Sequence, residues 1–124
     1  MKVKNIKITI KSRQEVLKEF AETYEKLRKG EKVKKHEELS FQNIETLRKF
    51  LTEKRIELLR VIKAKQPRSI YELAQLVQRD LKSVNTDIQI LKQLGLVSLE
   101  KVIEERKKMK PIVEFDTLNV EIVI

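Results

Sequence analysis

Apolar and polar residues alternate near both ends of the chain. Ile6, Ile8 and Ile10 lie at every second position in the stretch 2–10, and Leu118, Val120, Ile122 and Ile124 do so in the stretch 118–124. A period of two predicts strands with one buried face. Because a lone strand is unstable, we expect the two strands to pair with each other, within one chain or across a dimer.

The spacing changes to that of a helix after the first strand. Within residues 13–29, an apolar stripe recurs at intervals of three and four, at Val16, Phe20, Tyr24 and Leu27. Ser12 and Glu15 form a capping-box pattern before this helix, and Gly30 is typical of a helix end. The charged segment 31–38 has no period and is predicted to be a surface connection to a short helix ending near Leu51.

A compact module follows. Its predicted helices cover about 53–65, 69–77 and 81–94, and its predicted strands cover 96–101 and 111–115. Residues suited to N-caps precede or begin the three helices, at Thr52, Ser69 and Asp80. Pro67 prevents the first two helices from forming one continuous helix, and Gly95 is expected to end the third.

The sequence therefore divides into three parts. Residues 1–51 form a strand–helix extension with a predicted role in dimerisation, and residues 52–116 form the module. Residues 117–124 form a strand that pairs with the first one.

The composition excludes several classes of function. The chain has 124 residues and a net charge of +9, and it contains no Cys, one His and two Gly. Disulfide scaffolds, thiol chemistry, Cys-based or multi-His metal sites and glycine-rich phosphate loops are therefore excluded. Asp80 and Asp87 lack the partners of an acid–base pair, so we expect neither an enzyme nor a cofactor. There is no apolar run of ~20 residues and no signal-peptide pattern, so we expect a cytoplasmic protein.

The positive charge favours a polyanionic partner, but it is unevenly spread. Residues 1–60 hold 17 basic and 10 acidic side chains, whereas residues 61–124 hold 11 and 9. The excess is thus concentrated in the first half, and the composition leaves its role open.

The predicted helix 81–94 has an unusual outer face. At 100° per residue, Leu81, Val84, Ile88 and Leu91 share one face. The opposite pole and its flanks hold hydrogen-bonding side chains suited to base edges in a DNA groove, namely Lys82, Ser83, Asn85, Thr86, Gln89 and Gln93. Asp87 lies about 60° from the core seam, and we expect it to make an intramolecular contact.

The run PRSIYELAQLVQRDLKSVNTDIQILKQLGLV resembles the helix-turn-helix core of winged-helix transcriptional regulators of the broad MarR-like group. With SFQNIETLRKFLTEKRIELLRVI before it and KPIVEFDTLNVEIVI after it, nearly the whole chain resembles a family of short regulators found in archaea and some bacteria. The resemblance implies a winged helix, DNA binding and a homodimer. The expected fold class is mainly α with a small β component, a winged helix-turn-helix with an N-terminal strand–helix extension.

Two sets of site residues follow from position. The candidates for DNA contact are Arg68, Ser69, Tyr71, Lys82, Ser83, Asn85, Thr86, Gln89, Gln93, Arg106, Lys107 and Lys108. The candidates for a dimer interface are Ile6, Ile8, Ile10, Phe20, Tyr24 and Leu27. The helix over 81–94 would lie in the major groove, with the basic residues of the hairpin near the backbone.

The predicted function is sequence-specific DNA binding by a homodimeric transcriptional regulator that represses by occluding a promoter. One alternative is a non-specific architectural protein, for which the preference for one sequence over competitor DNA would be near one. A second alternative is an antitoxin-like module that binds another protein, for which a second chain would co-purify.

Overall fold

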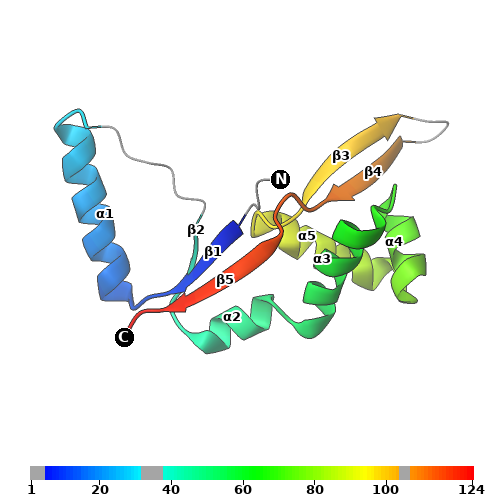
Figure 1. Cartoon of the computed structure of the whole chain (residues 1–124), viewed down its shortest axis with the longest axis horizontal. Helices are drawn as coiled ribbons and strands as arrows, with labels where there is room; N and C mark the ends of the chain where they lie inside the picture. The colour runs from blue at the N-terminus through cyan, green and yellow to red at the C-terminus, as the bar shows by residue number, and fades with distance from the viewer. Residues whose placement is uncertain (1–4, 32–37, 104–106) are drawn as a thin grey trace. The chain divides into compact units, whose positions relative to one another are not determined.

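A computed structural model describes residues 5–31, 38–103 and 107–124. Within these ranges the chain forms five helices and five strands (Figure 1). The helices are α1 (Arg13–Arg28), α2 (Ile44–Phe50), α3 (Glu53–Lys65), α4 (Ile70–Val77) and α5 (Leu81–Gln93). The strands are β1 (Asn5–Ile10), β2 (Glu38–Phe41), β3 (Ser98–Ile103), β4 (Lys107–Ile112) and β5 (Thr117–Ile122).

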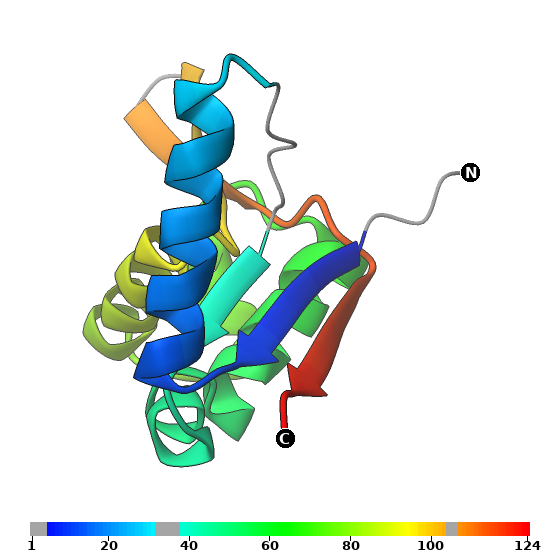
Figure 2. The ribbon, with the colours of Figure 1, turned by 90° about the vertical axis from the view of Figure 1, so that its left-hand side faces the viewer.

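The chain divides into two compact units, which we call unit 1 (residues 1–47 and 115–124) and unit 2 (residues 48–114). Unit 1 is built on a parallel three-stranded sheet in the order β2-β1-β5. The first and last strands of the chain lie side by side, as the blue and red arrows of Figure 2 show. The predicted pairing of the terminal strands is confirmed, and it occurs within one chain.

Strand register gives the sheet of unit 1 one apolar and one polar face. Ile8 of β1 is aligned with Leu39 of β2 and Val120 of β5, and Ile10 is aligned with Phe41 and Ile122. Aligned residues of neighbouring strands point to the same face of a sheet. Ile8, Ile10 and Phe41 are buried, and the alternating Lys7 and Thr9 lie on the opposite face.

The sequence-based fold class is wrong. The chain is an α/β protein with a parallel sheet and a separate antiparallel hairpin, not a mainly α winged helix-turn-helix with a strand–helix extension. The prediction failed because it treated residues 31–38 as a surface connection leading to a short helix and expected no strand directly before that helix. Residues 38–41 instead form β2, which turns β1, α1 and β2 into a βαβ unit with α1 as the crossover.

Unit 2 consists of three helices followed by a hairpin. Helices α3, α4 and α5 pack on one another, and β4 packs on α3 and α4. Val84, Ile88 and Leu91 of α5 are buried as the helical spacing predicts, whereas Leu81, expected on the same face, is 47% exposed. The core of unit 2 also contains Leu58, Ile62 and Leu73. β3 and β4 pair in antiparallel register, with Ser98 opposite Ile112 and Ile103 opposite Lys107.

The helix boundaries follow local chemistry. The hydroxyl or carboxylate of each predicted N-cap accepts a hydrogen bond from the backbone N–H three residues later, at Ser12, Thr52, Ser69 and Asp80. Gly30 and Gly95 follow α1 and α5 with φ of 75° and 78°, a region that disfavours side chains. These starts and ends are confirmed.

The hairpin strands lie elsewhere than predicted. β3 begins at Ser98 rather than at residue 96, and β4 ends at Ile112, although Pro111 was expected to begin a strand over 111–115. Pro111 lies in a two-stranded hairpin, where each strand has a free edge on which a missing N–H is tolerated.

Among the described residues, no helix has the length and apolar character needed to cross a bilayer.

Candidate nucleic-acid interface

Helices α4 and α5 are joined by a tight turn over residues 78–80. Gln78 ends α4 in a left-handed conformation with φ of 55°, and its N–H donates to the carbonyl oxygens of Ala74 and Gln75. Asp80 then caps α5, where its carboxylate accepts from the Ser83 N–H at 2.9 Å. Hydrogen bonds from the Ser83 amide and hydroxyl lower the pKa of Asp80. Val84, Ile88 and Leu91 bury one face of α5, so its other face points away from the core.

The outer face of α5 is exposed and polar. All six residues predicted to form it are exposed, namely Lys82, Ser83, Asn85, Thr86, Gln89 and Gln93. The Thr86 hydroxyl donates to the Lys82 carbonyl at 2.9 Å, and the Gln89 amide approaches the Asn85 side-chain oxygen at 3.4 Å. These intrahelical contacts orient the side chains and leave their remaining donors and acceptors on the surface.

Asp87, the one acidic residue of α5, is drawn toward the core by two arginines. Its carboxylate accepts from Arg55 Nε of α3 at 3.0 Å and from Arg79 Nη2 of the turn at 2.7 Å. The three side chains are 13–20% exposed. Arg55 also donates to the carbonyls of Lys49 and Phe50, at the end of α2. The expected intramolecular role of Asp87 is confirmed, and the outer face of α5 therefore carries no carboxylate.

The start of α4 is capped by Ser69, as predicted. The Ser69 side chain is buried and its hydroxyl accepts from the Glu72 N–H at 3.0 Å, while the Glu72 carboxylate accepts from the Arg68 N–H at 3.3 Å. Ser69 thus acts as a cap, and the carboxylate of Glu72 adds a negative charge at the start of α4. Arg68 and Tyr71 are exposed beside this start.

The hairpin carries further basic residues. Arg106 lies outside the described residues, Lys107 lies at the start of β4, and Lys108 is exposed. Cross-strand register also places Glu100 opposite Lys110 and Lys101 opposite Met109. Lys101 is exposed, and Ile103 at the end of β3 is 83% exposed.

The excess of positive charge lies mainly in unit 2 when side chains are counted by structural unit. Unit 2 holds 16 basic and 9 acidic side chains, and unit 1 holds 12 and 10. When the chain is divided at residue 60, most of the excess positive charge falls in the N-terminal half. Residues 48–60, which belong to unit 2, contribute five basic and two acidic side chains to that half. The positive excess thus belongs to the unit that contains α4 and α5.

The residues predicted for a dimer interface separate into two groups. Ile8 and Ile10 are buried within the chain, so they have no exposed surface to offer a second copy. Ile6 is half-buried. Phe20, Tyr24 and Leu27 of α1 are all well exposed.

No group of three or more His, Cys, Asp or Glu side chains within the described ranges could hold a metal ion.

The family model named HVO_A0114 matches residues 50–120. The chain belongs to the HVO_A0114 family. The matched region of this HVO_A0114 protein spans α3, α4, α5 and the hairpin and extends into β5. No curated protein and no solved structure matches the chain significantly.

Proposed function

We propose that the protein is a sequence-specific DNA-binding transcriptional regulator that places α5 in the major groove. The observation that carries this proposal is the exposed outer face of α5, which combines amide and hydroxyl side chains with the absence of any carboxylate. Asn and Gln form paired hydrogen bonds with adenine, and Lys binds the acceptors of guanine. A second helix after a tight turn is the element that helix-turn-helix proteins insert into the groove.

The charge of unit 2 supports the same proposal. Its excess of seven positive charges favours contact with phosphates, and the basic residues of β3 and β4 extend this character to the hairpin. Phosphate contacts position a protein on DNA but do not select a sequence. Selectivity therefore has to come from α5, where Asn85 and Gln89 are the main candidates.

The first experiment selects sequences that the full chain binds from a random pool of duplex DNA. A shared motif is expected, because the outer face of α5 presents a fixed pattern of donors and acceptors. Binding without a shared motif would support a non-specific architectural protein, and no binding at all would overturn the proposal.

The second experiment changes Asn85→Ala and Gln89→Ala together. We expect a loss of preference for the selected site on the order of 100-fold, since each well-formed side-chain contact to a base contributes about 1–3 kcal/mol of discrimination. Both side chains are exposed, so thermal unfolding should be almost unchanged.

A matched control replaces the same two residue types in unit 1. Gln42 and Asn119 are both exposed, and the pair Gln42→Ala and Asn119→Ala should retain full preference. Equal preference in the α5 variant and the wild type would show that α5 does not select the sequence.

Repression by occlusion is the regulatory outcome we propose. A selected motif that overlaps a promoter should be protected from nuclease by the protein, and transcription from that promoter should fall in vitro. Protection without any change in transcription would contradict repression while leaving DNA binding intact.

A further inference from the structure

Helix α1 is a crossover helix that does not bury its apolar side on its own sheet. It connects the parallel neighbours β1 and β2, a position from which a helix normally packs its apolar stripe on the sheet. No residue of α1 is buried. The helix turns a polar side toward the sheet instead.

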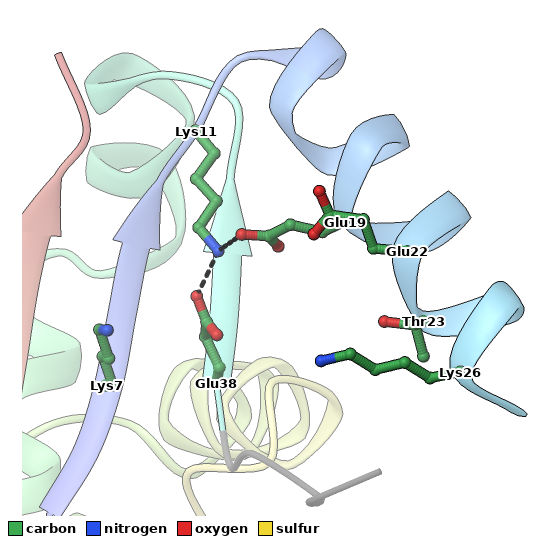
Figure 3. Close-up of a pocket in the computed structure, with 7 residues that line it drawn as sticks. All are labelled: Lys7, Lys11, Glu19, Glu22, Thr23, Lys26 and Glu38. Carbon is green, nitrogen blue, oxygen red and sulfur yellow. Dashed lines mark hydrogen bonds and ion pairs between the residues drawn. The ribbon is translucent and has the colours of Figure 1, made fainter. Parts of the chain in front are cut away.

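Charged side chains link α1 to the sheet. Lys11, directly after β1, lies 2.5 Å from Glu19 Oε1 of α1 and 2.9 Å from Glu38 Oε1 of β2, as Figure 3 shows. Lys11 is only 9% exposed. Glu22, Thr23 and Lys26 of α1 line the same polar cavity, which has a volume of about 410 Å³. These contacts hold the polar side of α1 toward the sheet.

The apolar stripe of α1 is left exposed as a result. Five large apolar side chains are between 41% and 72% exposed, namely Val16, Leu17, Phe20, Tyr24 and Leu27. Isolated apolar side chains are common on protein surfaces, but a continuous stripe marks an interaction site. Water is an unfavourable environment for such a stripe, and burial against a partner would remove that cost.

We propose that the apolar stripe of α1 binds the same stripe of a second copy of this chain, with the two helices antiparallel. Leu17, Phe20, Tyr24 and Leu27 follow the alternating spacing of three and four that two packed helices share. In the antiparallel arrangement, Leu17 lies opposite Leu27 of the partner and Phe20 opposite Tyr24 of the partner. The stripe is therefore complementary to itself.

The residues beside the stripe favour a second copy over a charged partner. One flank holds Gln14, Ala21 and Arg28, and the other holds Val16, Thr23 and Gly30. With one charge among six flanking positions, the stripe offers little to an acidic or basic surface. It also brings no like charges together in the antiparallel pair. Ala21 is small enough to let two helices approach closely.

The exposed area reaches the lower limit for a specific pair. From their exposed fractions, the five side chains of each chain would together bury on the order of 1,000 Å² in the dimer, the lower bound for specific interfaces. Antiparallel helices also align their macrodipoles favourably. This inference uses unit 1 alone and does not depend on DNA binding.

Sedimentation of the full chain provides the first test. A dimer is expected at a concentration of about 0.1 mM, which exceeds the micromolar dissociation constants of modest interfaces. Phe20→Glu together with Leu27→Glu should weaken the dimer by at least about 100-fold, since each carboxylate would lose its hydration at the interface. Both residues are exposed in the single chain, so circular dichroism should show the fold intact.

Lys18→Glu is the matched control on the polar side of α1, and it should leave the dimer unchanged. A wild-type monomer at this concentration overturns the proposal. A dimer that survives the double Glu variant places the interface elsewhere, for example at the open edge of β5, and also overturns it.

Engineered cysteines test the antiparallel arrangement, since the chain contains no Cys of its own. The variant with both Leu17→Cys and Leu27→Cys should form interchain disulfides on mild oxidation. Leu17→Cys alone should not, because ten residues of helix separate the two positions by about 15 Å, beyond the reach of a disulfide. A disulfide dimer from the single variant would indicate parallel helices and overturn the proposed arrangement.

Discussion

Asp87 shows how one residue sets the character of a surface. A carboxylate on the outer face of α5 would repel phosphates, yet Asp87 lies inward between Arg55 and Arg79, at 3.0 and 2.7 Å. The same contacts join α5 to α3 and to the turn before α5. Because Arg55 also donates to the last carbonyls of α2, one side chain connects the end of α2, α3 and α5.

Replacing Asp87 should therefore destabilise unit 2. Asp87→Asn keeps the size of the side chain but leaves two largely buried arginines without a carboxylate, and we expect a loss of about 3 kcal/mol in the free energy of unfolding. Urea denaturation measures this loss. Asp80→Asn is the matched control, since Asn caps a helix about as well as Asp. Equal and small effects in the two variants would contradict a structural role for the Asp87 contacts.

At the scale of elements, charged side chains rather than an apolar interface link α1 to β1 and β2. The Glu38 carboxylate accepts from the Thr9 hydroxyl at 2.6 Å and pairs with Lys11, and these contacts lower the pKa of Glu38. The hydrogen bonds to Glu19 and Glu38 raise the pKa of Lys11. A link made of charges depends on pH, unlike an apolar one.

The sign of this dependence follows from the pKa of Glu38. A lowered pKa means that the folded state binds the proton less readily than the unfolded state, so the stabilisation is present above pH 4.5, the ordinary pKa of Glu, and is lost as the pH falls through the lower folded pKa. Glu38→Gln should cost about 1–2 kcal/mol near neutral pH and much less in acid. Urea denaturation followed by the NMR signals of unit 1 measures both values.

Glu45→Gln serves as the control for this pH dependence. Glu45 is an exposed acidic residue of unit 1, and its replacement should leave the acid dependence of the wild type in place. If Glu38→Gln cost the same at all pH values, the carboxylate would not be the group responsible.

At the scale of the whole molecule, the sheet of unit 1 is formed in part by pairing of the first strand, β1, with the last strand, β5. β1 is hydrogen-bonded to β5 over six aligned residue pairs, from Asn5–Thr117 to Ile10–Ile122. The core of unit 2 comes from residues 48–114. The termini thus stabilise one unit, while the other has a core from a continuous segment.

Deleting residues 117–124 should unfold unit 1 alone. β1 would lose its partner and its apolar residues would be exposed, whereas unit 2 would keep its helices and hairpin. Hydrogen exchange should show β1 amides losing protection and α5 amides retaining it. Deleting Ile124 alone, beyond the end of β5, is the control and should change neither. Loss of protection in both units after the larger deletion would show that they unfold as one.

Local chemistry made much of this structure predictable. The caps at Ser12, Ser69 and Asp80 and the glycines at positions 30 and 95 define helix ends through their nearest neighbours, so the sequence is sufficient to locate them. The helical period placed Val84, Ile88 and Leu91 in the core and left Asn85 and Gln89 outside. The candidate surface on α5 was predictable for the same reason.

Other features were decided only by tertiary contacts. Residues 38–41 are too few to predict β2, and they form a strand because β1 offers hydrogen bonds along its free edge. This pairing made the fold α/β, and it left α1 as a crossover helix. No sequence period could show that Lys11 would hold the polar side of α1 against the sheet and leave its apolar stripe exposed, because that depends on Lys11 meeting both Glu19 of α1 and Glu38 of β2 in the folded chain.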